Sequence, residues 1–288
     1  MIRKGFRILK RVTSGIARGF VSLLPKRIVQ VPVCVPVLKG ELLKGRHALI
    51  TGGTSGIGLA MANTFVQHGA RVVITGRSEE RIKSVLDKIR IDGISGMVLD
   101  NSKCADFGLR IDAYAEQHGL PDILVNNAGQ ILCEKFGSTK IENYDEIMDV
   151  NLRGSYFLSQ EMANRWKKIN VRGNILNVGS SSSLRPGNSP YVLSKWGLRS
   201  MTIGLAKELV KDGIVVNGIA PGPTATKMFV GSGENGINWK KSPAGRLVTE
   251  DEIANLAVVL VSDLSRMVVG DMLFISGGCG VVTVDDVG

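Results

Sequence analysis

Short apolar runs rich in Val and Ile recur along the chain from Arg46 onward, and a segment with helical apolar spacing follows most of them. Near-continuous apolar runs indicate strands buried on both faces, and the amphipathic segments between them indicate covering helices. The expected strands are residues 47–51, 71–75, 96–100, 122–126, 174–178, 214–219 and 272–276. The expected helices lie near 57–68, 78–91, 104–118, 142–169, 190–212 and 250–262.

This alternation of strands and helices predicts an α/β fold, a doubly wound sheet of about seven parallel strands with helices on both faces. Residues 46–288 contain no internal repeat and no second change of composition. We therefore expect a single domain over residues 46–288, preceded by an extension of residues 1–45.

The start of the extension has the pattern of a basic amphipathic helix at about 100° per residue. Its apolar face holds Ile2, Phe6, Leu9, Val12, Ile16, Phe20 and Leu23, and the opposite face holds Arg3, Lys4, Arg7, Lys10, Arg11 and Arg18. Such a helix can bind an anionic membrane surface, serve as an organelle transit peptide, or pack on its own domain or a partner subunit. No apolar run approaches the ~20 residues that span a bilayer. We expect a cytoplasmic protein, with peripheral membrane contact or an organelle transit peptide as the alternatives.

The net charge of +10 is located almost entirely in the extension. Residues 1–46 contain eleven Lys or Arg and one acidic residue, while the other 242 residues carry 25 basic and 25 acidic side chains. The folded domain is therefore neutral, which argues against a nucleic-acid partner. The four cysteines are scattered without a CxxC pair, so neither a disulfide scaffold nor a metal site is expected.

A glycine-rich turn follows the first expected strand. Gly52, Gly56 and Gly58 stand between that strand and the next helix, in the spacing G-x-x-x-G-x-G. Glycine allows a tight turn and a close approach of the backbone to a pyrophosphate, and the helix N-terminus offers free N–H groups. The turn therefore predicts a dinucleotide site, and a plain strand-to-helix turn is the alternative.

At this point the sequence resembles the short-chain dehydrogenase/reductase family, in its single-domain branch, which carries TGxxxGxG here. Further stretches follow in the family's order: NNAG (126–129), Asn151 in DVNLRGSYF, NVGSS, YVLSK and APGPTAT (220–226). The resemblance covers about residues 46–280. It implies a Rossmann-type fold and hydride transfer between a nicotinamide cofactor and a carbonyl or secondary alcohol substrate.

The resemblance also implies the cofactor contacts. They are Gly52, Thr54, Ser55, Gly56, Ile57, Gly58, Arg77, Asp100, Asn127, Ala128, Gly129, Pro221, Gly222, Thr224 and Thr226, together with Tyr191 and Lys195. An acidic residue at the end of the second strand usually holds a free ribose 2′-OH, and arginine suits a 2′-phosphate. Gly76 and Arg77 stand there, so NADP is favoured and NAD is the alternative. Ser55 replaces the second basic residue that many NADP-preferring relatives carry in the glycine turn.

Tyr191 and Lys195 are spaced i, i+4, which places both side chains on one face of the expected helix 190–212. A free tyrosine has a pKa near 10, and a nearby lysine ammonium together with the positive oxidised nicotinamide lowers it by stabilising the phenolate. Tyr191 is therefore predicted to exchange a proton with the substrate oxygen. By resemblance, Lys195 also binds the nicotinamide ribose, and Asn151 holds a water that links the lysine to solvent.

One serine of Ser180–Ser183 is predicted to complete the catalytic group. In most relatives the catalytic serine precedes the tyrosine by thirteen residues, but that position here is Val178. Alignment on the strand end instead selects Ser180, which shortens the following loop by two residues. Because loops absorb length changes more easily than strand ends, Ser180 is preferred and Ser182 is the fallback. Its hydroxyl would stabilise charge that develops on the carbonyl oxygen.

The long glycine-rich stretch 227–246 is the expected substrate lid. Its candidate substrate contacts are Met228, Phe229, Trp239, Lys240, Lys241 and Arg246, and Cys133 is a further candidate near the pocket. The substrate is expected to be a small carbonyl or alcohol, and family resemblance implies a homodimer or homotetramer. Two other functions stay open: an NADP(H)-binding redox sensor or scaffold without turnover, and a membrane-surface adaptor.

Overall fold

Seven parallel strands form one sheet in the order β3-β2-β1-β4-β5-β6-β7. The computed structural model describes residues 40–132, 136–226, 237 and 239–282. The strands are β1 His47–Ile50, β2 Arg71–Gly76, β3 Ile94–Val98, β4 Ile123–Asn126, β5 Asn174–Val178, β6 Val215–Pro221 and β7 Met272–Ile275. The predicted doubly wound parallel sheet is confirmed, and every strand overlaps its expected segment. The order reverses between β1 and β4, the place where ligands bind in open α/β sheets.

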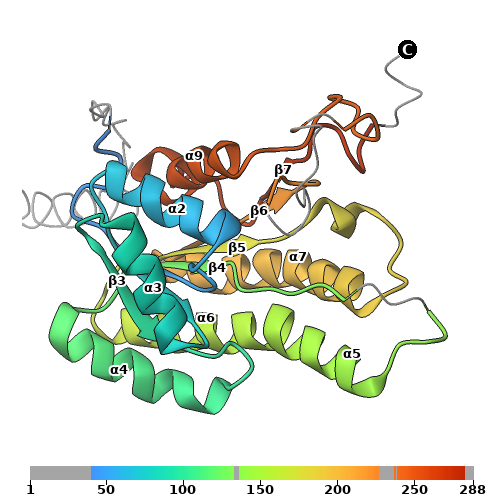
Figure 1. The fold of residues 1–288 in the computed structure, drawn as a ribbon. Coiled ribbons are helices and arrows are strands. Elements are labelled where there is room, and N and C mark those ends of the chain that lie inside the picture. The colour runs from blue at the N-terminus through green and yellow to red at the C-terminus, as the bar shows by residue number, and fades with distance from the viewer. Residues whose placement is uncertain (1–39, 133–135, 227–236, 238, 283–288) are drawn as a thin grey trace, which may run out of the picture. The chain divides into compact units, whose positions relative to one another are not determined.

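Helices cover both faces of the sheet (Figure 1). They are α2 Gly56–Gln67, α3 Glu79–Ile89, α4 Phe107–His118, α5 Ile141–Met148, α6 Gly154–Lys168, α7 Pro190–Leu209 and α9 Glu250–Val261. Figure 1 shows α2 and α9 together over one face and α4, α5 and α6 over the other. The two faces thus bury two separate apolar clusters.

Successive side chains along a strand belong alternately to these two clusters. Ala48 and Ile50 of β1 pack with residues of α2 and α9, whereas Leu49 packs with residues of α4, α6 and α7. Successive strand side chains point to opposite faces, so a strand needs apolar residues at every position when both faces are covered. This is the physical reason for the near-continuous apolar runs in the sequence.

The described chain packs on the domain before β1 begins. Leu43 is fully buried in the cluster under α2 and α9, and its N–H bonds to the carbonyl oxygen of His68. Arg46 forms an ion pair with Asp122, which anchors the entry to β1 beside the entry to β4. The expected amphipathic helix of the extension lies outside the described residues, and the domain boundary at residue 46 stays a prediction.

The single helix expected over 142–169 is interrupted in the structure. Between α5 and α6 the chain forms a π-helical turn, η2, over Asp149–Arg153. The Asn101 amide donates to the carbonyl oxygen of Val150, and a Cβ added at Gly154 would lie 2.1 Å from the Asn101 carbonyl oxygen. Asn101 thus occupies the space beside the turn, and the turn carries Asn151. Turns of this kind are frequent at functional sites.

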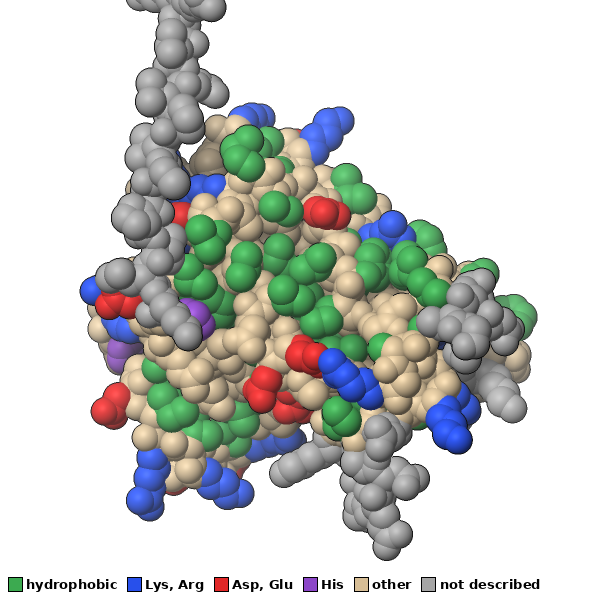
Figure 2. Space-filling view, turned by 90° about the horizontal axis from the view of Figure 1, so that it is seen from above, with side chains coloured by type: hydrophobic (Ala, Val, Ile, Leu, Met, Phe, Trp, Pro, Cys, Tyr) green, Lys and Arg blue, Asp and Glu red, His purple; other side chains and the backbone are tan. Residues whose placement is uncertain are grey.

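The face that α2 and α9 cover shows apolar side chains at its centre and side chains of both charges around them (Figure 2). Leu256 and Val259 of α9 are among the apolar residues that are partly exposed. None of the described helices has the length and apolarity that a bilayer crossing requires.

Candidate active site

The glycine-rich turn joins β1 to α2 at the carboxyl edge of the sheet. Gly52 and Gly56 have φ values of +62° and +57°, a region that favours glycine. A Cβ at Gly58 would lie 2.7 Å from the carbonyl oxygen of Gly52, so a larger residue would open the turn. Backbone conformation therefore explains the glycines at positions 52 and 56, and close packing explains the glycine at position 58.

The N-terminus of α2 is free of side-chain capping. Ser55 at the N-cap makes no capping hydrogen bond, and the first turn of α2 contains no acidic residue. By contrast, Ser78, Ser189 and Thr249 cap α3, α7 and α9 through their side chains. The backbone N–H groups at the start of α2 therefore have capacity for an anion, as a cofactor pyrophosphate would require. This turn fits a dinucleotide.

Thr51, which the sequence analysis did not select, ties the end of β4 to the glycine-rich turn. Its hydroxyl accepts hydrogen bonds from the N–H groups of Asn127 (3.0 Å) and Ala128 (2.9 Å). The Asn127 side chain donates to the carbonyl oxygens of Thr51 and Gly52 at 2.9 and 3.2 Å. The NNAG stretch is thereby held beside the turn. The position of Thr51 directly before the glycines is the signal that could have identified it.

The segment after β6 reaches the other side of the turn. The Gly222 N–H bonds to the carbonyl oxygen of Ile275, and the Thr224 hydroxyl donates to the carbonyl oxygen of Gly222. A Cβ at Gly56 would lie 3.8 Å from the Thr226 methyl group. This segment begins at Pro221, the last residue of β6. The predicted cofactor residues 221–226 therefore lie beside the start of α2.

At the end of β2, Gly76 and Arg77 lie next to the turn. A Cβ at Gly76 would lie 3.1 Å from the Thr54 methyl group, which leaves little room for an acidic side chain. Arg77 is exposed. Arg81, in the first turn of α3, lies within 3.4 Å of the Ser55 hydroxyl. A basic side chain thus reaches the turn from α3, although the turn itself contains none.

The predicted adenine contact, Asp100, follows β3 and organises the loop there. Its carboxylate accepts hydrogen bonds from the N–H (3.0 Å) and the hydroxyl (2.8 Å) of Ser102. The side chain is partly exposed at the carboxyl edge of the sheet. These local hydrogen bonds fix the direction of the carboxylate.

Tyr191 and Lys195 lie on α7, which begins with the Ser189 cap and Pro190. The Lys195 ammonium is buried, lies 5.8 Å from the centre of the Tyr191 ring and donates 2.9 Å to the carbonyl oxygen of Val178. Burial lowers the pKa of Lys195 to about 8, so it is charged at neutral pH. No other hydrogen bond of this ammonium is found among the described residues. A buried ammonium with one acceptor has donors to spare, which fits a ribose hydroxyl pair.

The protein's own groups do not lower the pKa of Tyr191. Burial raises the pKa of Tyr191, and a hydrogen bond from Ser180 offsets part of that rise. Among the protein's own groups, desolvation of the phenolate therefore outweighs the stabilising contacts. Tyr191 is a protonated phenol at neutral pH, the state that a proton donor needs.

The four serines divide into two kinds. Ser181 and Ser183 are buried, whereas Ser180 and Ser182 are partly exposed. The Ser180 hydroxyl accepts hydrogen bonds from the hydroxyl (2.9 Å) and the N–H (3.1 Å) of Ser182. Because Ser180 is also close enough to Tyr191 to lower its pKa, the preferred serine adjoins the predicted tyrosine, and the fallback serine lies directly beside Ser180.

Asn151 holds the NNAG loop against α7. Its side-chain oxygen accepts from the N–H of Gln130 at 2.8 Å, and its amide donates to the carbonyl oxygen of Gln130 and to the Ser194 hydroxyl. A Cβ at Gly129 would lie 3.4 Å from the Asn151 oxygen and 3.6 Å from the Lys195 nitrogen. The polar atoms of the Asn151 side chain are thus hydrogen-bonded to other groups of this chain, and they lie close to Lys195.

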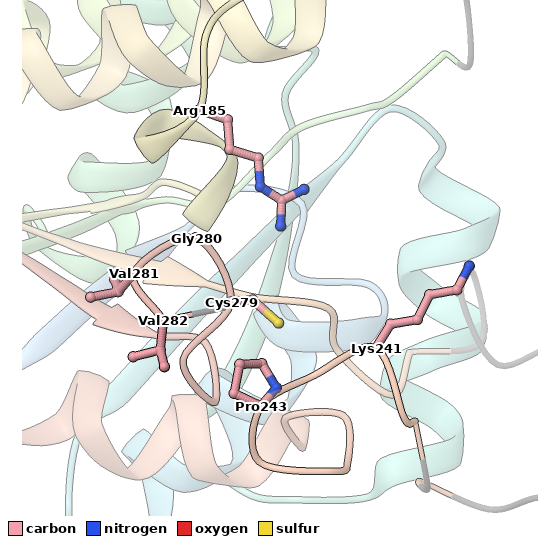
Figure 3. Close-up of a pocket in the computed structure, with 7 residues that line it drawn as sticks. All are labelled: Arg185, Lys241, Pro243, Cys279, Gly280, Val281 and Val282. Carbon is pink, nitrogen blue, oxygen red and sulfur yellow. The ribbon is translucent and has the colours of Figure 1, made fainter. Parts of the chain in front are cut away.

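A cavity of about 310 Å³ opens beside the 3₁₀ turn η3, Ser181–Leu184 (Figure 3). Arg185 and Lys241 line it, together with Pro243, Cys279 and the chain around it. Of the three predicted cations, only Lys241 lines the cavity. Arg246 instead pairs with Glu252, and Lys240 does not reach the cavity. Arg185 was not predicted, and Met228, Phe229 and Cys133 lie outside the described residues.

Comparison with known proteins agrees with this geometry. Residues 52–280 match a family model described as Enoyl-(Acyl carrier protein) reductase. Gluconate 5-dehydrogenase of Gluconobacter oxydans is 33% identical over 247 residues, which cover 82% of this chain and 95% of the relative. 3alpha-Hydroxysteroid dehydrogenase of Mediterraneibacter gnavus is 34% identical over 244 residues, with coverage of 82% and 97%.

Solved structures give the same result. A gluconate 5-dehydrogenase from Burkholderia cenocepacia, in complex with NADP and tartrate, is 31% identical with a TM-score of 0.77. The match covers 85% of this chain and 99% of that one. The chain belongs to the short-chain dehydrogenase/reductase family. It is an oxidoreductase that transfers a hydride between a nicotinamide cofactor and a small carbonyl or alcohol substrate.

Proposed function

We propose that the protein is an NADP(H)-dependent carbonyl reductase or alcohol dehydrogenase in which Tyr191 exchanges the proton. The observation that carries this proposal is the convergence of three side chains, one from the loop after β5 and two from α7. Ser180 follows β5 and lies close enough to Tyr191 on α7 to lower its pKa, while the Lys195 ammonium lies 5.8 Å from the centre of the Tyr191 ring. The Lys195 ammonium also contacts the carboxyl end of β5, and the Lys195 nitrogen would lie 3.6 Å from a Cβ added at Gly129 in the NNAG loop.

The roles follow from the chemistry of each group. A bound nicotinamide cofactor supplies the hydride in reduction and accepts it in oxidation. In reduction, the Tyr191 phenol donates its proton to the carbonyl oxygen, and the Ser180 hydroxyl donates a hydrogen bond that stabilises the developing charge. Lys195 holds its positive charge next to Tyr191, which favours the phenolate left behind. Asn151 links the NNAG loop to α7 through hydrogen bonds to Gln130 and Ser194.

The preference for NADP(H) is supported by two arginines, Arg77 directly after β2 and Arg81 in the first turn of α3. Gly76 leaves no acidic side chain to repel a 2′-phosphate, and Arg77 is exposed directly after it. Arg81 reaches Ser55 of the glycine-rich turn, where a second cation would face the same phosphate. Guanidinium groups bind phosphate through paired hydrogen bonds. The related gluconate 5-dehydrogenase structure contains NADP, which agrees with this choice.

A side-by-side titration with NADPH and NADH, followed by nicotinamide fluorescence, tests the preference. NADPH should bind at least tenfold more tightly than NADH. The R77A and R81A variants should each weaken NADPH binding about tenfold or more, as expected for a charge-assisted hydrogen bond, without weakening NADH binding. Lys83→Ala, an exposed change on the same helix, is the matched control. Tighter binding of NADH would reverse the cofactor choice and leave the fold unaffected.

We also propose a homodimer or homotetramer that contacts its copies through α6 and α7. These helices carry three large apolar side chains that are exposed in the single chain: Tyr156 (45%), Phe157 (38%) and Ile203 (56%). Exposed apolar patches mark surfaces that contact another protein. Light scattering after size-exclusion chromatography tests this assembly, and a monomer at micromolar concentration would exclude it.

The proposed location is the cytoplasm, with the basic extension in peripheral contact with an anionic membrane. Co-sedimentation with anionic liposomes should be lost when residues 1–39 are deleted. Equal sedimentation of both proteins would remove a role for the extension in membrane contact.

A further inference from the structure

We propose that the cavity between Arg185 and Lys241 binds the carboxylate of an anionic carbonyl or hydroxy acid substrate. This inference rests on the proposed reductase function, because it assigns the substrate class of the same site. It is carried by two cations in the lining of a cavity that adjoins the catalytic serine loop, and neither cation pairs with an acidic side chain among the described residues.

Three segments that are distant in sequence build the cavity. The carbonyl oxygen of Gly277 accepts hydrogen bonds from the N–H of Ala244 at 3.0 Å and from the hydroxyl of Ser242 at 3.3 Å. A Cβ at Gly280 would lie 3.1 Å from the carbonyl oxygen of Ser181 in η3. The loop 239–246, the turn after β7 and the serine loop thus support one another, so the cavity is a built feature of the described chain.

The cavity lies close to the reacting groups. Arg185 directly follows η3, and Ser180 directly precedes it. The four residues of a 3₁₀ turn advance by roughly 8 Å. A substrate whose carbonyl lies at Ser180 and Tyr191 could therefore place a carboxylate several bonds away at Arg185.

Arg185 and Lys241 are positioned to act on a ligand. Figure 3 shows the Arg185 guanidinium directed into the space above Cys279, while the Lys241 side chain, which also belongs to the lining, extends away from Cys279. Among the described residues, neither forms an ion pair, whereas Arg46, Arg165 and Arg246 each pair with carboxylates. Two unpaired cations around one hollow raise the local positive potential and favour an anion.

The other residues that line the cavity indicate the chemistry of the rest of the ligand. Apolar surface in the lining comes from Pro243, Cys279, Val281 and Val282. A cavity of about 310 Å³ is at the lower end of the range for small-molecule sites. The expected ligand is therefore a compact acid with a short hydrocarbon chain, whose carboxylate is bound by the Arg185 guanidinium in a paired geometry.

Hydrogen bonds of its backbone hold Arg185 at the cavity. Its carbonyl oxygen accepts a hydrogen bond of 2.7 Å from the Trp196 indole, and its N–H bonds to the carbonyl oxygen of Ser182. The side chain is exposed, so the guanidinium is free to rotate onto a ligand while its backbone stays fixed.

The first test compares 4-oxopentanoate with its methyl ester as substrates of the full-length protein in the presence of NADPH. The acid should have a kcat/KM at least tenfold above that of the ester. The R185Q and K241Q variants should each lower kcat/KM for the acid about 10- to 100-fold and reduce the acid-to-ester ratio toward one, since each removes a charge-assisted hydrogen bond. Lys240→Gln, the neighbouring exposed lysine outside the cavity, should keep the ratio. Equal kcat/KM for acid and ester would overturn the proposal.

A second measurement separates this inference from the reductase function. Calorimetric titration of 4-oxopentanoate into the protein, with and without NADP⁺, reports binding without turnover. Binding that is lost in R185Q and kept in K240Q supports the anion site even if no substrate is reduced. NADPH binding and reduction of the ester, without any preference for the acid, would leave the reductase function intact and remove the anion site.

Discussion

The Lys195 ammonium donates a hydrogen bond of 2.9 Å to the carbonyl oxygen of Val178, the last residue of β5. This bond ties α7 to the carboxyl edge of the sheet at the residue directly before Gly179 and Ser180. It holds the charge of Lys195 in a buried position, where the side chain has no acidic partner among the described residues. The lysine is thus fixed between the strand that leads to Ser180 and the helix that carries Tyr191.

The first prediction concerns stability and pH. The pKa of Lys195 is lowered from 10.5 to about 8 by burial, so between pH 8 and 10.5 the unfolded chain binds more protons than the native protein. The free energy of unfolding attributable to Lys195 should therefore rise with pH across that window, by about 3 kcal/mol in total. It should stay constant below pH 8, where both states are protonated.

Urea denaturation of the wild type and of K195M at pH 7, 8, 9 and 10 measures this contribution. The wild type should gain stability relative to K195M as the pH rises. Lys207→Met, an exposed change on the same helix, should show no pH-dependent difference from the wild type. A wild type and K195M that differ by a constant amount over the whole range would contradict the lowered pKa.

The second prediction separates Ser180 from Ser182. S180A should lower kcat about 100-fold, because it removes a donor to the developing oxyanion. S182A should have a smaller effect, because the N–H of residue 182 still donates to the Ser180 hydroxyl. Steady-state rates of the two variants decide between them. A larger loss in S182A would transfer the catalytic role to Ser182.

The third prediction tests proton exchange by Tyr191. Y191F should lower kcat by 10²- to 10⁴-fold, the range for general acid–base catalysis, while NADPH binding changes only a few-fold. Tyr144→Phe, at an exposed position of α5, is the matched control and should retain the wild-type rate. Turnover by Y191F near the wild-type level would remove the proposed role.

The fourth prediction concerns Arg199, which supports the serine loop from α7. Its guanidinium lies 5.4 Å from the ring centres of both Trp196 and Phe274, and it donates 3.1 Å to the carbonyl oxygen of Ser183. Arg199→Met should lower kcat about tenfold with little change in NADPH affinity, because the loop loses the donor that orients it. Lysine should restore the rate only in part, since it lacks the planar stacking surface.

Rates and NADPH titrations of R199M, R199K and the exposed control Arg110→Met measure this role. If R199M lost NADPH binding and kcat together, Arg199 would support the whole fold, not the serine loop in particular.

The pattern along the chain was enough to predict the sheet, its parallel strands and the helices on both faces. Burial on two faces demands apolar residues at every strand position, as Ala48, Leu49 and Ile50 show, and that requirement is local. The spacing of Gly52, Gly56 and Gly58 likewise reports a local turn. The i, i+4 spacing of Tyr191 and Lys195 places them on one helix face for the same reason.

Other features depended on contacts between distant segments. The helix is interrupted at Asn151, where the side chain of Asn101, fifty residues earlier in the chain, donates a hydrogen bond to the carbonyl oxygen of Val150. Arg81 meets Ser55, and Arg185 meets the turn around Cys279, only because the sheet order brings these loops to one edge. The pKa of Tyr191 depended on its burial, which its spacing from Lys195 does not reveal. Local periodicity fixes which elements form, whereas side-chain convergence requires the packing of all of them.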